Sequence, residues 1–207
     1  MKVVFVRHGE STGNAGFAAS DHSAMALTEV GRLQAEAVAA SWASPPDLIA
    51  TSIYLRTQFT AQPTIDRFPG TPMTVLPMEE FTYLDPSRWN GTLRSERLPH
   101  IEAFWKTADP TYRDGPAAES FEAFLGRIGL TLETLLTYPV DSLVYAFGHG
   151  QFMQAVRLVL LHPEWTAQQT MENFWSFNLC HPIANTAKLE VVCSGGEWQI
   201  QSEELAA

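Results

Sequence analysis

The residues that decide the fold are Val3-Val4-Phe5-Val6-Arg7-His8-Gly9-Glu10, close to the start of a chain of 207 residues. Four β-branched or aromatic side chains in succession predict a buried strand, and the later glycine predicts the turn at its end. The segment Leu143-Val144-Tyr145-Ala146-Phe147-Gly148-His149-Gly150 has the same form. Each segment therefore predicts a strand that ends in a histidine and a glycine turn, followed by a helix.

Strands and helices alternate along the rest of the sequence. Further strands are predicted at residues 47–51 and 71–76. Helices are predicted at 52–67, 95–106, 119–138 and 151–161, besides one that begins at the N-cap Thr28 and ends before Pro45. Pro63 is expected to end or kink the helix over 52–67. Residues 186–193 and 198–201 flank Ser194-Gly195-Gly196, which predicts a hairpin.

This order of elements predicts the α/β class. We expect a three-layer α/β/α arrangement: a mostly parallel central sheet, helices on both of its faces, and an antiparallel edge from the hairpin. The length of 207 residues predicts a single domain over residues 1–207. Residues 77–116 are irregular apart from the helix over 95–106, and are expected to form an insertion or lid. Its candidates for ligand contacts are Tyr83, Arg88, Trp89, Arg94 and Arg97.

The charge and apolar content of the chain disfavour some classes of binding partner. The chain has 13 Lys and Arg against 23 Asp and Glu, for a formal net charge of −10, which disfavours nucleic acid and anionic membrane surfaces. No run of 18 apolar residues occurs, so no membrane span is predicted. Cys180 and Cys193 are expected to be free thiols of a cytoplasmic protein, with a single disulfide as the alternative. The aromatic run over 174–177 is expected to belong to the core or to a homodimer interface.

The positions of His8 and His149 indicate a ligand-binding or catalytic site. Ligands of open α/β sheets bind beyond the carboxyl ends of the strands, so neighbouring strands would bring both imidazoles to one crevice. The adjacent glycines let backbone N–H groups approach a ligand, and the N-terminus of the following helix favours an anion. Arg7 adds a planar guanidinium suited to phosphate oxygens. The other histidines share no spacing and are expected to be structural or surface residues: His22, His100, His162 and His181.

The segment Arg7-His8-Gly9-Glu10-Ser11, with Asn14 after it, resembles the RHGE(T/S)xxN signature of the histidine phosphatase superfamily, whose fold is phosphoglycerate mutase-like. Four later segments resemble motifs of that family in the expected order. They are residues 27–35 (the LTxxGxxQA helix), 52–61 (SPLxRAxQTA), 79–81 (the acidic proton donor) and 148–150 (the SHG motif). The resemblance extends from residue 2 to about residue 151. Gly148 departs from it, because Ser or Thr usually precedes the histidine.

The resemblance implies a metal-independent phosphatase, a phosphomonoester hydrolase that acts on a small phosphorylated metabolite through a phosphohistidine intermediate. His8 would be the nucleophile, and a carboxylic acid would protonate the leaving oxygen and later activate water. Glu80 is the first choice for this acid, followed by Glu79 and then Asp85. The residues that would bind the phosphoryl group are Arg7, Asn14, Arg56 and His149. His149 would also be catalytic, because it would help to stabilise the transition state. Because arginines neutralise the phosphate charge, no metal and no other cofactor is expected.

Three alternative functions are left open. The first is a phosphoglycerate mutase of the same fold, although those enzymes are usually longer than 207 residues. The second is a phospho-ligand binding protein that has lost turnover. The third is a zinc hydrolase built on His8 and His149, which lacks an HExxH or similar ligand pair. The identity of the substrate is open in every case.

Overall fold

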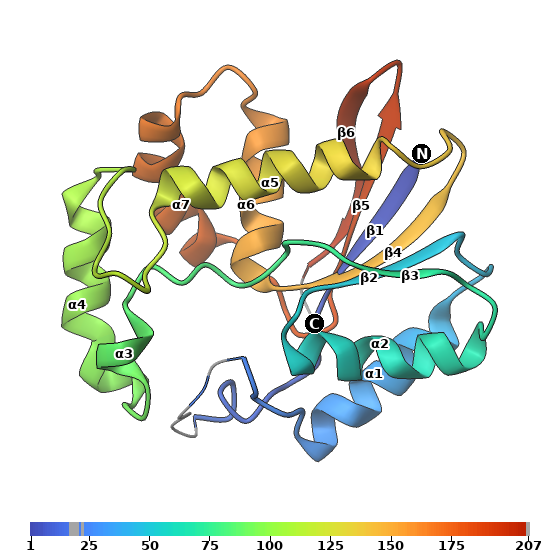
Figure 1. Cartoon of the computed structure of the whole chain (residues 1–207), viewed down its shortest axis with the longest axis horizontal. Helices are drawn as coiled ribbons and strands as arrows, with labels where there is room; N and C mark the ends of the chain where they lie inside the picture. The colour runs from blue at the N-terminus through green and yellow to red at the C-terminus, as the bar shows by residue number, and fades with distance from the viewer. Residues whose placement is uncertain (17–20, 22, 206–207) are drawn as a thin grey trace.

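A six-stranded sheet of order β3-β2-β4-β1-β5-β6 forms the centre of the molecule in the computed structural model, which describes residues 1–16, 21 and 23–205 (Figure 1). The strands are β1 (Lys2–Arg7), β2 (Leu48–Thr51), β3 (Met73–Val75), β4 (Leu143–Gly148), β5 (Lys188–Ser194) and β6 (Glu197–Glu204). Strands β1 to β4 pair in parallel, whereas β5 and β6 pair antiparallel. The predicted parallel sheet with an antiparallel hairpin edge is confirmed.

The central strands are apolar throughout because both faces of the sheet are covered. In β1, Val3 and Phe5 belong to one core cluster, while Val4 and Val6 belong to another on the opposite face. Successive side chains of a strand point to opposite faces, so a strand that is buried on both needs a continuous apolar run. The four residues are at most 2% exposed, which explains the pattern from which the strand was predicted.

Helices form the two outer layers. They are α1 (Glu29–Ser41), α2 (Leu55–Arg67), α3 (Pro86–Trp89), α4 (Arg94–Thr107), α5 (Phe121–Leu135), α6 (Gly150–Leu161) and α7 (Ala167–Cys180). Helices α1 and α2 lie on one face of the sheet, and α5 and α6 lie on the other (Figure 1). Helices α3 and α4 lie to one side, where α4 contacts α7. The three-layer α/β/α prediction is therefore confirmed.

Helix α2 continues through Pro63 to Arg67. Of the two outcomes expected of this proline, an end or a kink of the helix, the end is therefore wrong, and the kink stays a prediction. A proline at this position removes a hydrogen bond to the carbonyl four residues earlier, which belongs to Phe59. Phe59 is 47% exposed, and water can reach the outer side of the helix there. The inner side is held by Ala61 and Thr64, both fully buried, so the packing maintains the helix.

Two helices, α3 and α7, are absent from the sequence-based prediction. Thr166 caps α7 by accepting a hydrogen bond from the Gln169 N–H, and the Gln169 side chain accepts one from the Thr166 N–H. This is the reciprocal capping box that a Thr-x-x-Gln sequence can form. Asp85 caps α3 and Pro86 begins it, which is a common arrangement at helix starts. Both signals are present in the sequence.

Some of the predictions made from composition can be compared with the structure, and others stay predictions. Cys180 and Cys193 are free thiols, as expected. Within the described ranges, none of the helices has the length and apolar character needed to cross a bilayer. In the aromatic run over 174–177, Phe174 is fully buried in the core, as predicted for part of this run. A cytoplasmic location and a homodimer stay predictions.

Candidate active site

His8 and His149 lie side by side where β1 and β4 end. These strands are parallel neighbours, and their register pairs Arg7 with Gly148, so the next residue of each strand is a histidine. The two imidazole rings are 5.2 Å apart between centroids. His8 is 3% exposed and His149 is fully buried. The structure therefore brings together the two histidines that the sequence predicted to face one crevice.

Arg56, in the first turn of α2, connects the two rings. Its Nε donates to His8 Nε2 at 3.1 Å, and its Nη2 lies 3.2 Å from His149 Nδ1. A guanidinium can only donate, so both of these ring nitrogens carry a lone pair. The other nitrogen of His8, Nδ1, therefore donates to the Gly9 carbonyl at 2.7 Å. This fixes the tautomer in which the free electron pair of His8 is on Nε2.

Both histidines are neutral at pH 7. Burial, followed by the positive charges of Arg56 and Arg7, holds the pKa of His8 well below its usual value of 6.5. Burial and then Arg56 do the same for the pKa of His149. Removing a cation from water and placing it beside other cations both disfavour the protonated ring. His8 is thus kept in its nucleophilic form.

Arg7 ends β1 and packs under the start of α6. One of its terminal nitrogens donates to the Ile183 carbonyl, while its buried Nε has no hydrogen-bond partner among the described residues. Gly150, the first residue of α6, lies next to this side chain: a Cβ there would be in van der Waals contact with Arg7 Nε, at 3.4 Å. Arg7 therefore adds a buried positive charge with an unused donor to the site.

Glu80 is the carboxylate that reaches the site. Its Oε1 accepts a hydrogen bond from the Gln151 N–H, in the first turn of α6, at 2.9 Å. Its negative charge opposes the lowering of the pKa of Arg7 and Arg56 that burial causes. Glu79 is directed elsewhere, with its Oε2 3.6 Å from a terminal nitrogen of Arg127. Of the two adjacent acids, the geometry thus favours Glu80 as a catalytic group.

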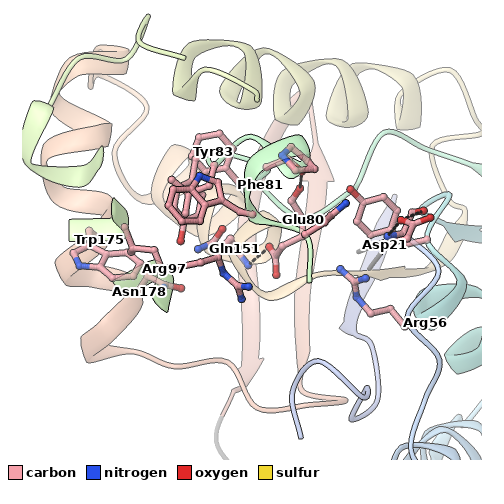
Figure 2. A pocket seen from close by; sticks show the side chains of 17 residues that line it. Asp21, Arg56, Glu80, Phe81, Tyr83, Arg97, Gln151, Trp175 and Asn178 are labelled. Carbon is pink, nitrogen blue, oxygen red and sulfur yellow. Dashed lines mark hydrogen bonds between the residues drawn. The ribbon is translucent and has the colours of Figure 1, made fainter. Parts of the chain in front are cut away.

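A cavity of about 340 Å³ opens beside these groups (Figure 2). Arg56, Tyr54 and Glu80 line the end that adjoins the histidines. The rest of its wall comes from the segment over 80–101, from α7, which supplies Trp175 and Asn178, and from Asp21, Ser23 and Gln151. This volume is at the lower end of the ~300–1,000 Å³ usual for sites that bind small molecules.

The loop after β1 is held in place by close backbone contacts. A Cβ at Gly9 would lie 2.5 Å from the Gly31 carbonyl oxygen, so only glycine fits there. Asn14 Oδ1 accepts a hydrogen bond from the Ser11 N–H and another from the Asn185 side chain. Asn185 also donates to the His8 carbonyl at 2.9 Å. Asn14 is exposed and holds this loop; its predicted contact with phosphate stays a prediction.

Comparison with known protein families identifies the group to which the protein belongs. The description "Histidine phosphatase superfamily (branch 1)" applies to a family model that matches residues 3–205. The chain belongs to this superfamily. No curated protein sequence is similar enough to count as a match.

Solved structures with this superfamily's fold match the whole chain. A phosphoserine phosphatase mutant from Entamoeba histolytica, in complex with phosphoserine, has 20% identity and a TM-score of 0.75, covering 98% of this chain and 96% of its own. The alpha-ribazole phosphatase from Shigella flexneri has 18% identity and a TM-score of 0.77, with coverage of 99% and 96%. A mycobacterial glucosyl-3-phosphoglycerate phosphatase has 21% identity and a TM-score of 0.74, with 99% of both chains covered. At this identity the likeness concerns the fold.

Of the other sequence candidates, Tyr83, Trp89 and Arg97 line the cavity. Arg88 forms an ion pair with Asp114 instead. Asp85 caps α3 and accepts hydrogen bonds from the Ser87 side chain and backbone, which lower its pKa. His100 packs against Trp89, with ring centroids 4.2 Å apart. Throughout the described ranges, no three His, Cys, Asp or Glu side chains come together as metal ligands. His22 and the side chain of Arg94 lie outside the described residues.

Ser52 is a site residue whose role the sequence did not reveal. It follows β2, is fully buried, and its Oγ lies 2.9 Å from His149 Nε2. Because Arg56 donates to Nδ1 of this ring, Nε2 carries the proton and donates to Ser52. The hydroxyl of the residue that follows β2 thus orients His149, although Gly148 has no side chain that can do so.

Arg127, on α5, is a second residue that the sequence did not single out. It binds both carboxylate oxygens of Glu119, at 2.7 and 2.8 Å. One of its terminal nitrogens also donates to the carbonyls of Pro77 and Glu79, at 2.9 and 3.0 Å. These bonds fix the backbone that leads directly to Glu80. Arg127 therefore positions the candidate acid without lining the cavity.

Proposed function

We propose that the protein is a phosphomonoester hydrolase that acts on a small phosphorylated metabolite through a phosphohistidine at His8. The observation that carries the proposal is the pair of buried neutral histidines joined by Arg56, with Glu80 among the residues that line the adjoining cavity. A phosphomonoester has nearly two negative charges, which Arg7 and Arg56 would neutralise. Membership of the superfamily supports the same activity.

The first step forms a bond between His8 Nε2 and phosphorus. The lone pair on Nε2 attacks, and the bond between phosphorus and the leaving oxygen breaks. An incoming phosphoryl group would take the place of the bond between Arg56 Nε and His8 Nε2, so that Arg56 donates to phosphoryl oxygens instead. The bond from His8 Nδ1 to the Gly9 carbonyl holds the ring during the attack and stabilises the positive charge that it acquires.

Glu80 supplies and recovers the proton. In its protonated form it donates to the leaving oxygen, so the first product is a neutral alcohol. As a carboxylate it then removes a proton from the water that attacks the phosphohistidine. The nitrogen–phosphorus bond breaks, its electron pair returns to His8 Nε2, and inorganic phosphate is released. The net reaction consumes one water and regenerates Glu80 in its protonated form.

Phosphate release from an aryl phosphate tests this proposal. Wild type is expected to turn over, whereas His8→Ala should be inactive and Glu80→Gln should be impaired most with alkyl esters, which need a proton on the leaving oxygen. The same assay with a chelator tests the expectation that no metal takes part. Full activity of His8→Ala, or transfer within phosphoglycerate without phosphate release, would contradict the proposal.

We further propose a cytoplasmic location and a small-molecule substrate. The free thiols Cys180 and Cys193 are typical of a reducing compartment. The net charge of −10 disfavours binding to nucleic acid. A homodimer is a separate prediction, which the molar mass in solution tests.

A further inference from the structure

The cavity extends beyond the phosphate-binding groups, and its far end has its own polar chemistry. Asp21 and Glu80 are the acids among its lining residues. In the view of Figure 2, Asp21 lies on the same side as Arg56, and Glu80 lies between Arg56 and Arg97. The end beyond Glu80 thus has a cation of its own, which the phosphoryl-transfer steps do not use.

Arg97 belongs to α4 and is half-buried. One of its terminal nitrogens donates to the carbonyl and hydroxyl oxygens of Thr92, at 2.6 and 3.1 Å. In the part of the chain that the structure describes, Arg97 has no ion pair with a carboxylate, and its Nε and second terminal nitrogen have no hydrogen-bond partner. A half-buried guanidinium that lines a cavity with donors to spare is suited to an anion.

Side-chain amides accompany this cation. Gln151 and Asn178 line the same cavity, and Figure 2 shows both on the Arg97 side of Glu80. Amide groups donate hydrogen bonds to carboxylate oxygens. Gln151 Oε1 is buried without a hydrogen-bond partner among the described residues. This oxygen can only accept, so it is the Nε2 of the same amide that would donate to an anion.

Three aromatic side chains, Tyr83, Trp89 and Trp175, form an aromatic wall of the same cavity. Trp175 stacks on Trp105 with ring centroids 5.2 Å apart, and Tyr83 lies 5.5 Å from the same ring. Trp89 is held by the bond from its Nε1 to Asp114 at 3.2 Å. These rings are fixed by their own packing, so they present a preformed surface to the middle of a ligand.

We propose that the substrate is a phosphomonoester whose leaving group has an apolar, ring-sized body and a carboxylate or similar anionic group at the end remote from the phosphate. The phosphate would lie at Arg7 and Arg56, the body against the aromatic wall, and the remote anion at Arg97. This inference rests on the proposed phosphatase function and defines its substrate class. The cavity volume of about 340 Å³ limits the ligand to a small metabolite.

Two synthetic esters isolate the effect of the remote charge. Para-carboxyphenyl phosphate and para-carbamoylphenyl phosphate have nearly the same size, and both carry an electron-withdrawing carbonyl opposite the leaving oxygen. They differ in the negative charge. We expect wild type to favour the carboxylate in kcat/KM by ~10-fold or more, the ratio that a charge-assisted hydrogen bond gives.

Substitutions in α4 test whether Arg97 causes the preference for the carboxylate ester. Arg97→Gln should bring the ratio of the two kcat/KM values close to one, and Arg97→Lys should keep part of it because the charge is retained. Lys106→Gln is the matched control, since Lys106 is exposed on the same helix and does not line the cavity. It removes one positive charge from α4 and should leave the ratio at the wild-type value.

The outcomes separate this inference from the proposed function. If wild type hydrolyses neither ester, the proposed phosphatase function fails. If it hydrolyses both with equal kcat/KM, the function stands and the anionic substrate class is wrong. A wild-type preference that Arg97→Gln retains would place the anion elsewhere and overturn the assignment to Arg97.

Discussion

The hydroxyl of Ser52 should matter for catalysis although it touches no substrate atom. Ser52→Ala removes the hydroxyl oxygen that accepts a hydrogen bond from His149 Nε2. The distance between Ser52 Oγ and His149 Nε2 is 2.9 Å. Both residues are fully buried, so water cannot replace the hydroxyl without a rearrangement. The variant leaves a buried N–H unsatisfied and allows the His149 ring to rotate or change tautomer. Its Nδ1 would then no longer be held against Arg56 Nη2, which lies 3.2 Å from it.

The size of the effect follows from the burial of this bond. Leaving a buried donor unsatisfied costs about 1–3 kcal/mol. If this cost falls on the transition state, kcat/KM decreases by about 5- to 150-fold. If it falls on the folded state instead, the melting temperature decreases by about 2–4 °C for each kcal/mol in a chain of this size. Measuring both quantities shows how the loss is divided.

Thr64→Val provides the matched control. Thr64 Oγ1 is also fully buried and accepts a hydrogen bond from a ring N–H, that of Trp42, at 2.9 Å. It lies on α2, outside the cavity lining, so its loss should reduce stability without changing kcat/KM. Aryl phosphate kinetics and thermal unfolding of both variants give the comparison. The reasoning is refuted if Ser52→Ala keeps the wild-type kcat/KM while it loses stability as the control does.

Other perturbations have equally definite outcomes. Arg127→Met should decrease kcat/KM by ~10-fold or more, because the backbone before Glu80 loses two hydrogen bonds from a charged donor; kinetics that match wild type would exclude a positioning role. Burial holds the pKa of His8 below 6.5, so the unfolded chain binds more protons than the folded one below that pH. The free energy of unfolding in urea should therefore decrease as the pH falls below 6.5, and decrease less in His8→Asn; an unchanged pH dependence would show that His8 makes no contribution. Gly31→Ala would place a methyl carbon 2.0 Å from the Glu10 carbonyl oxygen, and should destabilise the fold by about 1–3 kcal/mol in the same assay.

The fold was predictable where a local pattern determines the outcome. The apolar runs before His8 and His149 predict strands because each is buried on both faces, and parallel pairing of these strands is enough to bring the imidazoles together. Pro63 does not end α2 as its low helix propensity predicts, because propensity is a weak preference that packing against the sheet overrides. Helix α7 was missed, although the Thr166–Gln169 capping box was present in the sequence.

The supporting residues of the site were not predictable from local patterns. Ser52 meets His149 across 97 positions of sequence, and Arg127 reaches the Glu79 carbonyl across 48. Nothing in the residues around Ser52 or Arg127 indicates these partners, because the contacts exist only once β2, β4 and α5 are assembled. The sequence ranks Glu80 ahead of the adjacent Glu79 only by resemblance. The structure directs Glu80 toward the cavity and Glu79 toward Arg127, and the role of Glu80 as the acid stays a prediction.

Trapping the phosphoenzyme tests the central claim most directly. Radiolabelled dinitrophenyl phosphate has a leaving group that needs no proton, so Glu80→Gln should accept the phosphoryl group on His8 and release it slowly. After an alkaline quench, we predict a label that is stable to alkali and labile to acid, which peptide mass spectrometry locates on His8. The same experiment with His8→Ala should give no label. A label on any other residue, or turnover of wild type with no label in the Glu80→Gln variant, would contradict the phosphohistidine mechanism.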